Sequence, residues 1–129
     1  MVLDASAAIE LLLNTGPGSR LAARLVDERE AVCVPHMIDL EIAQVLRRYV
    51  LQGALGVERG SLALAHWRSL EVDRYPHEPF LSRIWELRSN VSAYDAVYVA
   101  LAEALSTVLV TADRRLAGAP GVGALIELT

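Results

Sequence analysis

The chain has 129 residues, of which 53% are hydrophobic and 22% are charged, and its formal net charge at pH 7 is −4. This length and composition predict one domain over residues 1–129 with a hydrophobic core, and they exclude a disordered protein. The longest apolar runs are far shorter than the roughly 20 residues that a membrane-spanning helix needs, so we expect no membrane segment. The acidic balance excludes nucleic-acid binding through bulk positive charge but allows a local basic rim.

The first residues, MVLD, already read as a strand, and we identify no signal segment before it. Cys33 is the only cysteine, so no intrachain disulfide can form, and its setting in AVCVP predicts a small core residue. All basic residues are arginines, which excludes chemistry that depends on a lysine ammonium. We therefore expect a cytoplasmic protein.

Short runs rich in Val, Leu and Ile predict strands at Met1–Asp4, Ala31–Pro35, Glu71–Tyr75, Thr107–Thr111 and Ala124–Leu128. Helical patterns lie between them, at Ser6–Asn14, Ser19–Glu30, His36–Gln52, Val57–Leu70, His77–Arg88 and Ala93–Leu105, with a short helical turn at Arg114–Ala117. Strands that alternate with helices and are apolar throughout indicate a parallel sheet covered on both faces. The predicted fold is therefore α/β, a three-layer α/β/α sandwich with a mainly parallel five-stranded sheet.

Two of the predicted strands end at an aspartate that precedes a helix. Asp4 follows the first strand in MVLDASA, and Asp113 follows the fourth in VLVTADRR. Either residue alone is a typical cap for the helix after it. However, ligands of open parallel sheets bind outside the carboxyl ends of the strands, so this pair also indicates a site.

Glu41 lies beside an apolar helical stripe that includes Ile38 and Ile42. It is either at the edge of the stripe with its carboxylate in water or part of the same site as the strand-end aspartates. Asp39 falls on a different side of this helix, and we expect it to be solvated.

Asp95 is the only charged residue between Arg88 and Glu103, in a helix that is nearly apolar all round. An isolated ionised carboxylate is costly in a core, so Asp95 needs a partner. Ser92 and Asp95 have the spacing of a capping box, which gives a purely local alternative.

Four carboxylates at one edge of the sheet would repel each other unless their pKa values rose or a cation neutralised them. Oxygen ligands fit hard divalent cations, and Mg²⁺ commonly binds a few carboxylates and retains waters. The histidines offer no set with zinc spacing because they are scattered along the chain: His36, His66 and His77.

The segments VLDASA, PHMIDLEIAQVLRR, SAYDAVYVALAEAL and LVTADRRLA resemble the PIN-domain family, and within it the VapC-type toxins of bacterial toxin–antitoxin pairs. The resemblance implies a metal-dependent endoribonuclease that binds Mg²⁺ or Mn²⁺, an antitoxin partner and a homodimer. It implies catalytic and metal-binding roles for Asp4, Glu41, Asp95 and Asp113, and supporting hydroxyl roles for Ser6 and Thr111.

The chain departs from the family pattern at two places. Gln44 stands where many relatives have an asparagine, which could alter a hydrogen bond that supports Glu41. The RRLA segment after Asp113 lacks a further acid that some relatives carry, so we expect a second metal ion to be held weakly or only with substrate.

Arginines flank two of the predicted site residues and could contact the phosphates of single-stranded RNA. They are Arg47, Arg48, Arg114 and Arg115. The alternatives are that they are solvated or meet acidic groups of an antitoxin.

Two rival functions keep the predicted fold. One is a catalytically weak module that works through protein–protein binding, using the apolar helices RRYVLQGALG and SLALAHWRSL. Trp67 and Trp85 are likewise expected in core or dimer contacts rather than stacked on RNA bases. The other rival is a carboxylate–Mg²⁺ phosphohydrolase or receiver domain. It is disfavoured because Ser6 stands where the phosphohydrolase pattern has a second aspartate, and because no lysine is present.

Overall fold

The computed structural model describes residues 1–28 and 30–129. Within them, one sheet contains the strands β1 (Val2–Leu3), β2 (Val32–Pro35), β3 (Val72–Tyr75), β4 (Leu109–Thr111) and β5 (Ile126–Leu128). The strand order is β3-β2-β1-β4-β5, and every neighbouring pair is parallel. The parallel five-stranded sheet predicted from the sequence is confirmed.

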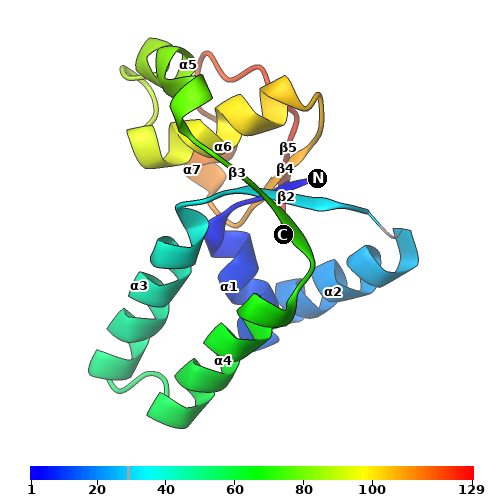
Figure 1. The fold of residues 1–129 in the computed structure, drawn as a ribbon, viewed down its shortest axis with the longest axis vertical. Coiled ribbons are helices and arrows are strands. Elements are labelled where there is room, and N and C mark those ends of the chain that lie inside the picture. Colours follow the sequence, from blue (N-terminus) through cyan, green and yellow to red (C-terminus); the bar gives the residue numbers. More distant parts are fainter. Residues whose placement is uncertain (29) are drawn as a thin grey trace.

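Helices connect the strands and cover both faces of the sheet (Figure 1). They are α1 (Ala5–Leu13), α2 (Gly16–Glu28), α3 (Ile38–Leu51), α4 (Val57–Ser69), the short 3₁₀ helix η1 (Glu78–Phe80), α5 (Leu81–Glu86), α6 (Ala93–Ala104) and α7 (Arg114–Ala117). In Figure 1, α1 to α4 lie on one side of the sheet and α5 to α7 on the other, which confirms the three-layer α/β/α arrangement.

The strand order reverses at β1, which places the carboxyl ends of β1 and β4 side by side. The chain leaves β1 toward β2 and β3 on one side, and it returns to β4 and β5 on the other side. The beginnings of α1, α3, α6 and α7 gather at this edge, on the left of Figure 1. An edge of this kind is where open α/β sheets bind ligands.

The three central strands are buried, whereas the edge strands β3 and β5 are partly exposed. Cys33 is buried in β2, as predicted. The apolar runs on the central strands pack against helices on both faces, so burial of apolar surface is the main force that holds the layers together. Among the described residues, no helix has both the length and the apolar character that crossing a membrane requires.

The two tryptophans differ in their environments. Trp67 is fully buried, and its indole N–H donates to Asp39 at 2.6 Å. Arg74 also binds Asp39, at 3.1 Å, and the Asp39 side chain remains 45% exposed, so Asp39 is solvated as predicted and has these two contacts in addition. Trp85 is 69% exposed, with the guanidinium of Arg88 stacked over its ring, which excludes the core alternative for Trp85 and leaves the dimer contact as a prediction.

Helix α2 begins at Gly16, three residues before the predicted start at Ser19. The sequence NTGPG does end α1, at Leu13 with Asn14 as its C-cap, but the next helix begins inside this sequence, where Thr15 accepts a hydrogen bond from the Gly18 N–H at 3.1 Å. Pro17 fits because the first turn of a helix has no intrahelical use for the missing N–H.

The predicted helix His77–Arg88 divides into η1 and α5. Pro79 lies in the first turn of η1, where a missing N–H is tolerated. The last turn is tight, with Arg88 N–H donating to the Trp85 carbonyl three residues back, so α5 ends at Glu86.

The close approach of α1 and α2 depends on Gly18. A Cβ built at Gly18 would lie 1.9 Å from the backbone oxygen of Glu10, which cannot move independently of α1. Replacing Gly18 with Ala gains about 1 kcal/mol of helix propensity. Overpacking lowers the free energy of unfolding by about 1–3 kcal/mol, and we expect the upper part of this range because the Cβ meets backbone rather than a movable side chain. We predict that Gly18→Ala destabilises the protein by about 1–2 kcal/mol in urea denaturation.

Gly118→Ala is the matched control, because the nearest atoms to its added Cβ are 3.9 Å away. It should change the free energy of unfolding by less than about 0.5 kcal/mol. Equal stability of the two variants would contradict the close approach of α1 and α2.

Candidate active site

The structure brings the four acids that the sequence singled out to the border of one pocket, with a volume of about 620 Å³. Asp4 follows β1, Glu41 and Asp95 lie in the first turns of α3 and α6, and Asp113 caps α7. In residues 1–28 and 30–129, no three acidic, histidine or cysteine side chains stand close enough together to hold a metal ion between them. The acids thus share a pocket, while each carboxylate has its own local hydrogen bonds.

Asp4 is the most deeply placed of these acids, with 6% of its surface exposed. Its Oδ1 accepts hydrogen bonds from the Ala7 N–H at 2.8 Å and from Ser6 Oγ at 2.7 Å, so the predicted helix cap is present. Burial raises the pKa of Asp4 despite these donors, because the charged form loses its hydration. Asp4 therefore caps α1, and it also places on the pocket wall a carboxylate whose charged form is disfavoured by burial.

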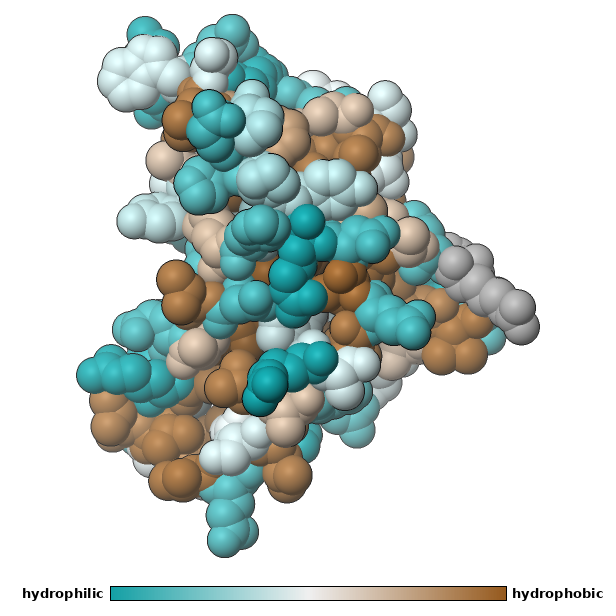
Figure 2. All heavy atoms as spheres, viewed as in Figure 1, coloured by the Kyte–Doolittle hydropathy of each residue, from teal (hydrophilic) through white to brown (hydrophobic). Residues whose placement is uncertain are grey.

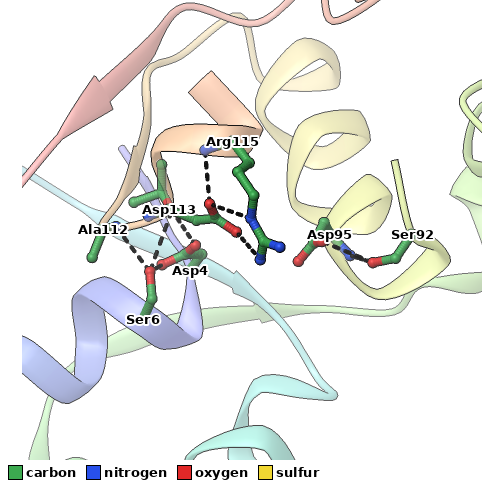
Figure 3. Close-up of polar contacts among 8 residues, drawn as sticks. Asp4, Ser6, Ser92, Asp95, Ala112, Asp113 and Arg115 are labelled. Carbon is green, nitrogen blue, oxygen red and sulfur yellow. Dashed lines mark hydrogen bonds and ion pairs between the residues drawn. The ribbon is translucent and has the colours of Figure 1, made fainter. Parts of the chain in front are cut away.

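Ser6 and Thr111 tie β1 and β4 together beneath the pocket. Thr111 Oγ1 donates to Oδ2 of Asp4 and accepts from the Asp113 N–H at 2.9 Å. Ser6 Oγ accepts from the Ala112 N–H at 2.8 Å while it donates to Asp4 (Figure 3). These hydroxyls fix the orientation of the Asp4 carboxylate and the position of the chain that leads to Asp113.

Glu41 is half-buried on α3 and accepts a hydrogen bond from the phenol of Tyr98 on α6. Burial raises the pKa of Glu41, and the negative charges of Asp95 and Asp4 raise it further. Within the described residues, neither Glu41 nor Asp4 has an ion pair with a basic group. The interior wall of the pocket therefore has an excess of negative charge.

Asp95 and Ser92 make the contacts of the capping box that the spacing predicted. Ser92 Oγ donates to Oδ2 of Asp95 at 2.8 Å and accepts from the Asp95 N–H at 3.1 Å. The local alternative is thus correct, but it does not remove Asp95 from the site, because its side chain also borders the pocket.

Asp113 is the only one of these acids with a basic partner in the described part of the chain. The backbone N–H of Arg115 donates to Oδ1 at 2.8 Å, and its guanidinium reaches Oδ1 at 3.4 Å and Oδ2 at 3.3 Å (Figure 3). The hydrogen bonds and positive charge of Arg115 hold the pKa of Asp113 below its ordinary value. Asp113 thus has a positively charged partner, which Asp4 and Glu41 lack among the described residues.

The predicted RNA-contacting arginines lie at different places relative to the pocket. Arg48 borders it and stacks its guanidinium 5.6 Å from the ring centre of Tyr49. Arg47 and Arg114 are exposed but do not line this pocket, and Arg115 is engaged with Asp113.

Sequence reasoning missed several side chains that complete the pocket wall. Tyr98 follows Asp95 by three residues on α6, so helical periodicity could have placed the two on one face. Leu40 and Tyr94 are large apolar side chains that are 77% and 67% exposed at the pocket border, and no periodic signal marks them. Gln44, singled out as a departure from the family pattern, also lines the pocket.

The donor chemistry of the pocket suits a hard divalent cation, although no three of the carboxylates are close enough to contact one ion together among the described residues, so water would complete its coordination. Carboxylate and hydroxyl oxygens line the pocket, no sulfur or imidazole does, and three of the four carboxylates have no ion pair with a basic group among the described residues. Oxygen donors of this kind, with room for water, are the environment in which proteins hold Mg²⁺.

Comparison with known families agrees with this site. A family model described as the PIN domain matches residues 1–122. The chain belongs to the PIN domain family. Ribonuclease VapC9 from Mycobacterium tuberculosis is 53% identical over 116 residues, which cover 90% of this chain and 87% of the relative.

Solved structures share the fold of this PIN domain. PAE2754 from Pyrobaculum aerophilum matches with a TM-score of 0.72 at 23% identity, over 97% of this chain and 81% of its own. VapBC2 from Rickettsia felis, solved bound to a DNA fragment from its promoter, matches with a TM-score of 0.71 at 12% identity, over 98% of this chain and 96% of its own. At these identities the likeness concerns the fold alone.

Burial of the Asp4 carboxylate should affect the free energy of unfolding when EDTA keeps the protein free of metal ions. Because burial raises the pKa of Asp4 above its ordinary value of 3.8, the charged form destabilises the folded state at pH 7. This penalty is complete above the folded-state pKa and disappears as the pH falls through it. We predict that Asp4→Asn is more stable than the wild type at pH 7, and that in urea denaturation this advantage shrinks as the pH falls through the folded-state pKa of Asp4.

Asp73→Asn, at an exposed position in β3, is the control and should change the free energy of unfolding at pH 7 by only a small amount. An advantage of Asp4→Asn that grew as the pH fell would contradict the assignment of a raised pKa.

Proposed function

We propose that this PIN domain is a Mg²⁺- or Mn²⁺-dependent endoribonuclease and the toxin of a type II toxin–antitoxin pair. The observation that carries the proposal is the pocket at the reversal point of the sheet. There Asp4 and Glu41 are held as partly buried carboxylates without basic partners in the described chain. The name of the relative VapC9 as a ribonuclease supports RNA as the substrate.

Asp4, Glu41, Asp95 and Asp113 are the residues that would hold the metal, directly or through water. A bound divalent ion would lower the pKa of a water and neutralise charge on the scissile phosphate. The network of Ser6 and Thr111 keeps Asp4 in one orientation, which fixes where its oxygens face the pocket.

We assign to Glu41 the orientation of the attacking water. Tyr98 donates to Oε2 of Glu41 and so fixes the carboxylate, and the other oxygen remains for the water. The raised pKa of Glu41 makes it a better proton acceptor than a fully solvated glutamate, because burial disfavours its charged form.

RNA reaches an acidic pocket only if cations flank it. Arg48 borders the pocket, and we infer that it binds a phosphate next to the scissile one. Arg47 and Arg114 are exposed beyond the border and would contact phosphates further along the strand, and Arg115 would do so once it is released from Asp113.

The α3–α4 hairpin offers the surface that we assign to protein partners. Leu51, Val57 and Leu62 are between 62% and 69% exposed there. Figure 2 shows apolar residues gathered at the end of this hairpin, at the lower left. We infer that this patch takes part in a homodimer or in antitoxin binding, and that the protein acts in the cytoplasm, where RNA and antitoxin are synthesised.

The central prediction of the proposal is metal-dependent cleavage that requires the pocket acids. The purified protein should cut a labelled single-stranded RNA pool with Mg²⁺ or Mn²⁺ and stop when EDTA is added. Asp4→Asn and Asp95→Asn should each lower the cleavage rate by at least about 100-fold, because each removes a charged metal ligand. Circular dichroism should show that both variants remain folded.

Asp73→Asn removes the same charge from exposed β3 and should cleave at the wild-type rate. Full cleavage by both pocket variants would contradict the proposal. Metal binding without cleavage of any RNA would favour the rival function, a module that works through protein–protein binding.

A negative charge on the exposed apolar surface of the α3–α4 hairpin, formed by Leu51, Val57 and Leu62, should weaken self-association. We predict that the wild type has twice the chain mass of 14.0 kDa in light scattering, and that Leu51→Glu shifts it toward the monomer. The control, Val26→Glu on α2, replaces an equally exposed apolar residue outside the hairpin and should leave the mass unchanged. A monomeric wild type would exclude the dimer.

A further inference from the structure

Arg115 engages both carboxylate oxygens of Asp113. Its backbone N–H and Nε donate to Oδ1, and its Nη2 donates to Oδ2. A cation that bound Asp113 from the pocket would therefore meet an oxygen already in contact with a guanidinium.

The same guanidinium also faces Asp95. A second pocket of about 350 Å³ adjoins the first, and it is bordered by Asp95, Asp113 and Arg115. Asp95 and Asp113 thus border both pockets, whereas Arg115 borders only the second. In Figure 3 the guanidinium of Arg115 lies between the two carboxylates.

We propose that Arg115 is a displaceable internal cation that competes with the divalent ion for Asp113 and Asp95, and that an RNA phosphate releases it. This inference rests on the proposed function. It makes Arg115 a positioning residue that couples RNA binding to metal binding, in addition to any direct contact with RNA.

The exposure of Arg115 allows this exchange. Its side chain is 93% exposed, and the Nη2–Oδ2 distance of 3.3 Å is long for a charged hydrogen bond. An exposed ion pair of this kind is weak, so the side chain can leave Asp113 at little cost. By contrast, the Asp4 carboxylate is bound by Ser6 and Thr111 and has no exposed basic partner in the described part of the chain.

Metal binding and RNA binding are coupled in this proposal because both involve Arg115. A phosphate that binds Arg115 removes the competitor from Asp113, so RNA should tighten metal binding. By thermodynamic reciprocity, the metal should tighten RNA binding by the same factor. The factor is limited by the strength of an exposed ion pair, which corresponds to about two- to fivefold.

The first test measures Mn²⁺ affinity without RNA, by the electron paramagnetic resonance signal of free Mn²⁺. Arg115→Gln should bind Mn²⁺ about two- to fivefold more tightly than the wild type, because the competitor is gone. Arg115→Lys keeps the positive charge but loses the planar guanidinium. Its Mn²⁺ affinity should therefore lie between those of the wild type and Arg115→Gln. Arg68→Gln removes the same charge at an exposed position of α4 that borders neither pocket, and should change the affinity much less.

The second test repeats the titration with a short oligodeoxythymidylate, corrected for Mn²⁺ bound by the oligonucleotide and checked for intactness on a gel. The oligonucleotide should tighten Mn²⁺ binding to the wild type and to Arg68→Gln, and this effect should be largely lost in Arg115→Gln.

The outcomes separate this inference from the proposed function. A wild type that binds no Mn²⁺ would overturn the metal-dependent function itself. Binding of Mn²⁺ with equal affinities for Arg115→Gln and Arg68→Gln, or equal effects of the oligonucleotide on all variants, would overturn only the role of Arg115.

Discussion

The site depends on one unfavourable interaction, the burial of the Asp4 carboxylate at the point where the strand order of the sheet reverses. The hydrogen bonds from Ala7, Ser6 and Thr111 orient this carboxylate but do not replace its lost hydration, and its pKa is raised. A buried anion with donors and no cation costs stability in the empty protein. In the proposed function a bound cation would offset that cost, in the way that functional sites commonly trade stability for activity.

The parallel topology explains why acids distant in the sequence meet. The helices that follow β1, β2 and β4 begin at the same edge of the sheet, and α6 begins there as well, so an acid in the first turn or cap of each lies near the others. Helix N-termini also favour negative charge. Each acid therefore has a local reason to occupy its position, as Asp95 and Asp113 show, and the shared pocket arises from the fold as a whole.

The sequence predicted the sheet, its direction and the shared edge, because apolar strands alternating with amphipathic helices allow few other arrangements. It could not reveal that Tyr98 on α6 binds Glu41 on α3, since this contact depends on how two helices are placed. Nor could it reveal that the guanidinium of Arg115 turns back to Asp113, the cap of the same helix, since this depends on the side-chain conformation. The misplaced start of α2 has a similar origin. The hydroxyl of Thr15 converts a run of Gly and Pro that reads as a stop into a helix start.

The most direct test of this account is the free energy of unfolding with and without Mg²⁺, for the wild type and Asp4→Asn. If the pocket holds a divalent ion against its buried charge, saturating Mg²⁺ should stabilise the wild type in proportion to its affinity, and Asp4→Asn should gain little. Equal stabilisation of both proteins, or none of the wild type, would contradict the central claim that the buried carboxylate of Asp4 is balanced by a bound cation.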